Sequence, residues 1–131
     1  MMGTSVKTTR ARAARILLLG DHISRNQSVL NNLRERHNVI TSNGERELGN
    51  YLEGQSIDLI VLEISESPSE PLTALQLIKQ QKPALKVIVI NNGQSIDVVA
   101  KAFKYGAIDF FKTPVNVPLF CERIDALIRK H

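Results

Sequence analysis

The sequence predicts a single α/β domain in which helices cover both faces of a parallel β-sheet. Five short apolar runs alternate with amphipathic segments of helical length, and this alternation is typical of repeated β-α units. The connections between the segments are short. The chain has 131 residues, of which 43% are apolar, so it can bury one hydrophobic core but is too short for two comfortable domains.

The five predicted strands differ in how apolar they are. They span residues 15–19, 38–41, 57–63, 86–90 and 108–111. The first, third and fourth are apolar at nearly every position, as strands covered by helices on both faces are. The second is brief and polar at its ends, which favours a position near an edge of the sheet.

The segments between the strands have the length and the pattern of crossover helices. They span residues 24–36, 45–53, 72–81, 95–105 and 117–130, and each carries a stripe of apolar side chains. Ser95 is the expected N-cap of the fourth helix, and Gly106 is its C-terminal stop. Asn116 is the expected N-cap of the fifth helix, which has Pro118 in its first turn.

The charge of the chain is concentrated at its N-terminus. Residues 1–14 contain three basic residues and no acid, which leaves 14 basic against 13 acidic residues in the rest of a chain with net charge +4. We therefore expect residues 1–14 to be a flexible basic tail and do not expect the domain itself to bind nucleic acid. No apolar stretch approaches the roughly 20 residues that span a bilayer, and no signal peptide is evident, so we expect a cytoplasmic protein without membrane contact.

Motifs for other kinds of chemistry are missing from the sequence. Cys121 is the only cysteine, and the three histidines share no ligand spacing, so neither a disulfide nor a metal cluster is expected. The sequence contains no GxGxxG, no GxxxxGK[ST] and no G-x-S-x-G. These observations argue against an enzyme of the nucleotide-binding or hydrolase classes.

The candidate site lies where the predicted strands end. In an open parallel sheet, ligands bind beyond the carboxyl ends of the strands. The residues at those ends are Gly20, Asp21, Glu63, Asn91 and Thr113.

These β-α units and their strand-end residues resemble the receiver domain of bacterial two-component response regulators. The resemblance covers residues 15–130 and is most specific over residues 87–114, where VIVI, a polar turn, a helix and KYGAIDFFKTP follow one another. RILLLGD is similar to the first strand of a receiver, and SIDLIVLEI to the strand that carries the phosphoacceptor. The resemblance implies a flavodoxin-like three-layer α/β/α sandwich over residues 15–131, with five parallel strands in the order 2-1-3-4-5.

The resemblance also shows where this chain departs from the family. Receivers transfer a phosphoryl group from a histidine kinase to an aspartate, with a magnesium ion held by that aspartate and an acidic pair, and with a hydroxyl residue and a lysine on the phosphoryl oxygens. Here Gly20-Asp21 replaces the acidic pair and Glu63 replaces the phosphoacceptor. Asn91 replaces the hydroxyl residue, and Thr113 replaces the lysine.

The four departures predict a site that no longer supports phosphoryl transfer. Glu63 is one methylene longer than aspartate, and a misplacement of about 1 Å costs on the order of a hundredfold in rate. With Gly20 in place of an acid, Asp21 and Glu63 are at most a weak magnesium site, so we expect no cofactor. Lys112 precedes Thr113 and should face away from the site, because adjacent side chains of a strand point to opposite faces.

Other positions of the family pattern concern switching and partners. The position of the switch aromatic maps onto Phe110, which has no phenol oxygen. Lys101, Lys104 and Tyr105 map onto the face of the fourth helix, fifth strand and fifth helix, which receivers use for dimers and partners. A cis peptide bond before Pro114 is expected from the family pattern.

The predicted function is therefore an atypical receiver domain that is not an enzyme. It signals by binding a protein partner or a second copy, without phosphorylation of an aspartate, and an output domain downstream of residue 131 is compatible with this role. Two alternatives stay open. One is a receiver that is still phosphorylated with help from Lys112, and the other is a small-ligand sensor that reuses the pocket among Gly20, Asp21, Glu63 and Asn91. Whether Glu63 mimics the phosphorylated state or is a solvated acid also stays open.

Overall fold

A five-stranded parallel sheet forms the centre of the computed structural model, which describes residues 13–43, 48–54, 56–64, 69–93 and 96–129. The strands are β1 (Arg15–Leu19), β2 (Asn38–Ser42), β3 (Leu59–Ile64), β4 (Lys86–Asn91) and β5 (Asp109–Lys112). Their order is β2-β1-β3-β4-β5, and every neighbouring pair is parallel. The predicted fold class and strand order are confirmed.

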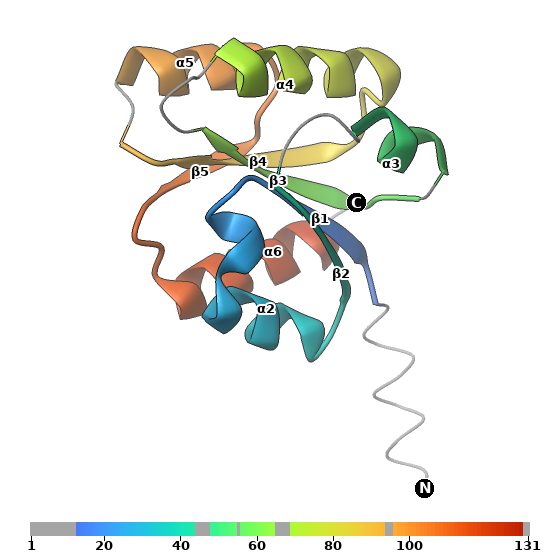
Figure 1. Cartoon of the computed structure of the whole chain (residues 1–131), viewed down its shortest axis with the longest axis vertical. Coiled ribbons are helices and arrows are strands. Elements are labelled where there is room, and N and C mark those ends of the chain that lie inside the picture. Colours follow the sequence, from blue (N-terminus) through green and yellow to red (C-terminus); the bar gives the residue numbers. More distant parts are fainter. Residues whose placement is uncertain (1–12, 44–47, 55, 65–68, 94–95, 130–131) are drawn as a thin grey trace, which may run out of the picture.

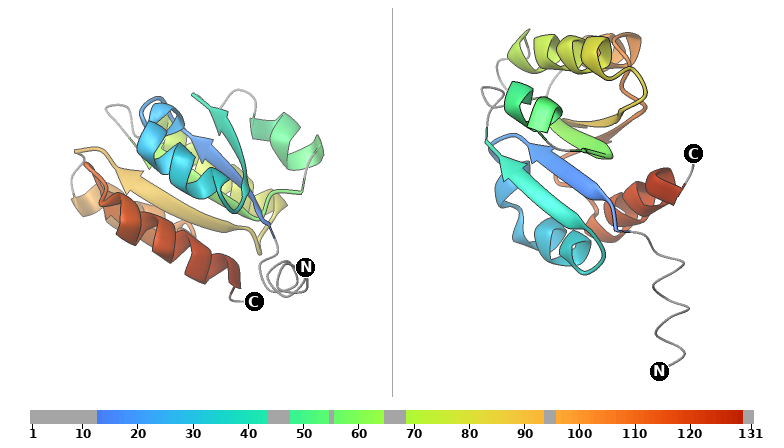
Figure 2. Two further views of the ribbon diagram at one scale, coloured as in Figure 1. Left: turned by 90° about the horizontal axis from the view of Figure 1, so that it is seen from below. Right: turned by 90° about the vertical axis from the view of Figure 1, so that its right-hand side faces the viewer.

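Helices cover both faces of this sheet. They are the 3-10 turn η1 (Ile23–Arg25) and the helices α2 (Gln27–Arg34), α3 (Leu48–Gly54), α4 (Ser69–Gln81), α5 (Ile96–Lys104) and α6 (Val117–Arg129). Helices α3, α4 and α5 pack on one face, while α2 and α6 pack on the other (Figures 1 and 2). None of the helices in the described ranges is long and apolar enough to cross a membrane.

Each strand divides its side chains between two hydrophobic clusters, because successive side chains point to opposite faces. In β1, Leu17 and Leu19 face α3, α4 and α5, while Ile16 and Leu18 face α2 and α6. The same alternation continues through β3 and β4. It fixes which face each strand-end side chain takes.

The first helical segment differs from the prediction of one helix over residues 24–36. It is divided into η1 and α2, and α2 begins only after Asn26. The backbone of Asn26 is extended, with φ −78° and ψ 98°, and its Oδ1 accepts a hydrogen bond from the Val29 N–H at 3.0 Å. Asparagine side chains compete for backbone donors in this way, so they favour a helix start over a helix interior.

Two other predicted caps agree with the structure, whereas α4 begins at Ser69, three residues before the predicted start at residue 72. Oδ1 of Asn116 accepts from the Leu119 N–H at 3.1 Å, as expected of an N-cap. Gly106 has φ +114° and ends the segment after α5, with its N–H donating to the Phe103 carbonyl. Ser95, the expected cap of α5, lies outside the described residues.

The packed domain begins earlier than predicted, because it includes Ala14. Residues 1–12 lie outside the described residues, but Ala14, which was assigned to the tail, is fully buried. Its N–H donates to Nδ1 of His37 at 3.1 Å. The packed domain therefore includes Ala14.

Candidate functional site

Four strand-end positions share one face of the sheet at its carboxyl edge. The strand residues Leu18, Val61, Ile90 and Phe111 all pack toward α2 and α6. The positions two residues further along the chain belong to the same face by the alternation of the pleat. These positions are Gly20, Glu63, Asn92 and Thr113.

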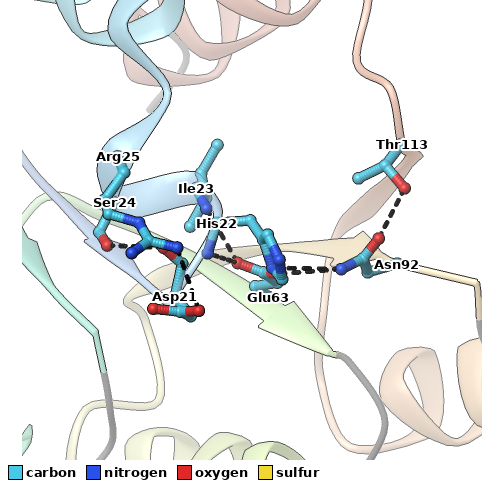
Figure 3. Close-up of polar contacts among 8 residues, drawn as sticks. All are labelled: Asp21, His22, Ile23, Ser24, Arg25, Glu63, Asn92 and Thr113. Carbon is cyan, nitrogen blue, oxygen red and sulfur yellow. Dashed lines mark hydrogen bonds and ion pairs between the residues drawn. The ribbon is translucent and has the colours of Figure 1, made fainter.

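The side chain of Glu63 is the centre of the site. It comes from β3 and is only 2% exposed. Its Oε1 accepts from the backbone N–H groups of His22 and Ile23, each at 2.9 Å. Its Oε2 lies 2.7 Å from Nδ1 of His22 and accepts from Nδ2 of Asn92 at 3.2 Å (Figure 3).

These four contacts use all the acceptor capacity of the carboxylate. An ionised carboxylate has about four lone-pair positions, and here each oxygen receives two donors. Because a carboxylate cannot donate, the contact with His22 places a proton on Nδ1. Glu63 is therefore a buried and fully hydrogen-bonded anion. The prediction left open that it is a solvated strand-end acid, and its burial contradicts that alternative.

Gly20 makes the space that this carboxylate occupies. A Cβ built on Gly20 would lie 2.4 Å from Cβ of Glu63 and 2.7 Å from its Oε1. The backbone of Gly20 also has φ +145°, a conformation that favours glycine. The missing acid at position 20 and the longer acid at position 63 are thus complementary.

Asp21 does not join the site. Its carboxylate is exposed and pairs with Nη2 of Arg25 at 3.2 Å, and Figure 3 shows it pointing away from Glu63. Within the described ranges no group of three or more His, Cys, Asp or Glu side chains could hold a metal ion. The residues of the receiver family's magnesium site are therefore a poor fit for that ion here, since Glu63 has no free lone pair and Asp21 is turned to Arg25.

Asn92 and Thr113 extend the hydrogen-bond chain along the carboxyl edge of the sheet, from β3 to the end of β5. Oγ1 of Thr113 donates to Oδ1 of Asn92 at 2.9 Å, and Nδ2 of Asn92 donates to Glu63 (Figure 3). The peptide bond between Thr113 and Pro114 is cis, as expected. The chain of contacts joins the ends of β1, β3, β4 and β5.

A pocket of about 250 Å³ lies beside this chain of contacts. Its lining includes His22, Glu63, Asn92 and Thr113, together with apolar side chains. Asn91 and Lys112 do not line this pocket. Each stands one residue before a pocket residue and so belongs to the opposite face by the pleat.

Sequence reasoning missed His22 and Asn92. His22 directly follows Gly20-Asp21, which stands in place of the family's acidic pair, and Asn92 directly follows Asn91. The alternation that placed Lys112 outside the site would also have pointed from Asn91 to Asn92. No signal of this kind was available for His22, which lies in a turn and not in a strand.

The predicted switch and interaction residues lie apart from the pocket. Phe110 packs against the cluster of α3, α4 and α5 and meets the ring of Phe103 edge to face at 5.8 Å. Lys101 and Lys104 are exposed on α5, whereas Tyr105 is partly buried. Phe110 is thus a packed core aromatic in this structure.

The chain is similar in sequence to known transcriptional regulatory proteins. No family model matches the sequence. The chain is 34% identical over 74 residues to the transcriptional regulatory protein MalR of Bacillus subtilis, which covers 56% of this chain and 32% of that protein. It is 25% identical over 116 residues to the alginate biosynthesis transcriptional regulatory protein AlgB of Pseudomonas aeruginosa, covering 85% of this chain and 25% of that protein.

Solved structures of response regulators have the same fold as this chain. A response regulator from Thermotoga maritima superposes with a TM-score of 0.78 at 24% identity, over 88% of this chain and 98% of that one. NtrX from Brucella abortus superposes with a TM-score of 0.75 at 26% identity, over 89% of this chain and 28% of that one. The chain therefore has the fold of response regulator receiver domains and is similar in sequence to transcriptional regulatory proteins. It spans about a third or less of the length of the curated relatives that it matches.

Proposed function

We propose that this receiver domain transmits a signal by binding a protein partner, without being phosphorylated and without enzymatic activity of its own. The observation that carries the proposal is the state of Glu63. Its carboxylate is buried, holds four hydrogen bonds and occupies the space left by Gly20. A carboxylate in this state has no free lone pair with which to attack a phosphorus atom.

Within the described residues, no lysine or arginine side chain lines the pocket beside Glu63. Transfer to a carboxylate depends on cations that offset the charge developing on the phosphoryl oxygens. Thr113 stands where the family has its lysine, and its hydroxyl is engaged with Asn92. Lys112 is exposed and does not line the pocket, which disfavours the alternative of a shifted but active site.

The partner surface is proposed to be the face formed by α5, β5 and α6, which we call the α5–β5–α6 face. Phe103 and Ile108 are 41% and 40% exposed there, next to the exposed Lys101 and Lys104. Apolar side chains beside charges are a common composition for a protein interface. A second copy of the chain or an output protein would bind there.

Incubation with magnesium and acetyl phosphate, followed by intact mass measurement, tests the absence of phosphorylation. We expect no gain of one phosphate, while a receiver with an intact aspartate site is modified in the same reagents. A stoichiometric gain that is lost in Glu63→Ala would refute the proposal. A gain that is lost in Lys112→Ala instead would favour the shifted active site.

A further inference from the structure

The pocket beside Glu63 is small and mostly walled by apolar groups. Its volume of about 250 Å³ is slightly below the usual range for drug-sized ligands. Ile23, Ile90, Pro114 and Val115 supply the apolar walls. A pocket of this size fits a molecule of about one ring.

Most polar groups around the pocket are already engaged. Glu63 accepts four hydrogen bonds, and Asn92 uses its Nδ2 on Glu63 and its Oδ1 on Thr113. The proton of the Thr113 hydroxyl points to Asn92. The Glu63 carboxylate therefore has no lone pair left to accept from a ligand, and the Thr113 hydroxyl has no proton left to donate to one.

The imidazole of His22 is different, because only one of its nitrogens is held. Nδ1–H donates to the buried Glu63 carboxylate at 2.7 Å, which fixes the ring. No hydrogen bond to Nε2 is found within the described part of the chain, and the side chain is 63% exposed. In the neutral ring with Nδ1 protonated, Nε2 is an acceptor.

We infer that this pocket binds a small, largely apolar molecule that carries one hydrogen-bond donor, which is recognised by Nε2 of His22. The apolar walls receive the body of the molecule, and the donor replaces water at Nε2. Glu63 is the positioning residue, since it sets the tautomer and the angle of the ring. The inference goes beyond the proposed function, because it gives this receiver a ligand input in place of phosphorylation.

A pair of probes of nearly equal shape tests the recognition. Phenol carries the donor, and fluorobenzene replaces the hydroxyl by a group that cannot donate. We expect phenol to shift the amide signals of Ile23, Asn92 and Val115 in a ¹H–¹⁵N NMR titration, with a dissociation constant in the millimolar range typical of so few atoms. Fluorobenzene should bind about 3- to 10-fold more weakly, which is the worth of one hydrogen bond.

Variants of the same chain separate the donor contact from the cavity. Val115→Phe should fill the pocket and abolish the phenol shifts, while Leu119→Phe makes the same kind of change at a 57% exposed position outside it. His22→Asn keeps an N–H near the position of Nδ1 but removes Nε2, so it should bring phenol down to the affinity of fluorobenzene.

Two results would overturn the inference. One is equal binding of phenol and fluorobenzene to the unmodified chain, a comparison that needs no variant to fold. The other is the absence of saturable shifts at the pocket amides at about 20 mM phenol, a concentration about twentyfold above a dissociation constant of 1 mM. Neither result bears on phosphorylation, which is measured separately by mass.

Discussion

Gly20 and Glu63 form one unit at the scale of single residues, since the first has no side chain where the second places its carboxylate. Gly20→Ala should lower the free energy of unfolding by about 2–5 kcal/mol, because the new Cβ meets Glu63 and the positive φ strains any side chain. Urea denaturation measures the loss. Gly49→Ala is the matched control, because its added Cβ would meet nothing within 4 Å beyond its own helix backbone and its two chain neighbours. It sits in α3 and should raise stability by about 0.5–1 kcal/mol. Equal effects at both glycines would contradict the fit of Gly20 to Glu63.

Burial of Cys121 should make its thiol react slowly. It is 2% exposed, and desolvation raises the pKa of its thiol from 9.0 to about 11. A rise of about two units in the pKa lowers the thiolate fraction at pH 8 on the order of a hundredfold. Alkylation by iodoacetamide should therefore be at least that much slower in the native chain than in the urea-unfolded chain. The thiol has the lower pKa in the unfolded chain, so it ionises there first as the pH rises, and this ionisation favours unfolding. Its contribution to stability is therefore present below pH 9 and is lost as the pH rises from 9 toward 11. Fast labelling of the native chain would show that α6 opens locally.

The candidate site could be predicted only in part from the sequence. Glu63 is predicted because it ends an apolar run, and Thr113 because it stands where the resemblance places the lysine. The pleat correctly separates Lys112 from Thr113. Asn92 was missed because the strand was taken to end one residue too early. The role of His22 could not be read from the sequence, since it depends on the Glu63 side chain turning back toward β1.

At the scale of elements, a buried histidine joins the segment after α2 to α6. Nδ1 of His37 accepts from the Ala14 N–H, and its Nε2 lies 2.8 Å from Oδ1 of Asp125. The other oxygen of Asp125 pairs with Nε of Arg36 at 3.0 Å. Since the backbone N–H can only donate, the ring is protonated on Nε2 and donates to Asp125.

Removal of Asp125 should therefore loosen this junction. Asp125→Ala leaves the buried Nε2–H of His37 without an acceptor, and we expect a loss of about 1–3 kcal/mol in the free energy of unfolding by urea. Glu122→Ala, an exposed acid on the same helix, should change it by less than about 0.5 kcal/mol. Similar effects of the two substitutions would show that the His37 contact adds nothing to stability.

The helices show why element types were predicted better than element limits. Apolar periodicity located all the helices and strands of the described ranges, because both faces of the sheet must be covered. The break before α2 was missed because Asn26 stands within a continuous amphipathic pattern. Only the hydrogen bond from Val29 to its side chain decides that the α-helix begins there.

At the scale of the whole molecule, the proposed partner surface can be examined through self-association. If a second copy binds the α5–β5–α6 face, reversal of charge by Lys101→Glu and Lys104→Glu should weaken the dimer on the order of tenfold in sedimentation experiments. Lys82→Glu makes the same change at an exposed position of the α4–β4 connection and should leave the dimer intact. A chain that stays monomeric at millimolar concentration would exclude a second copy and leave an output protein as the partner.

The response of the folded chain to magnesium should distinguish it from a receiver domain that has a working acidic site. An ion that binds the folded chain with a dissociation constant of 1 mM would, at 10 mM, add about 1.4 kcal/mol to the free energy of unfolding. We expect no such gain in urea denaturation with magnesium chloride against sodium chloride of equal ionic strength. The physical reason is that Glu63 has no lone pair left for a metal and Asp21 is held by Arg25 at 3.2 Å. A magnesium-specific gain that disappears in Glu63→Gln would mean that the ion displaces His22 from the carboxylate, and the metal-free assignment of the site would then be wrong.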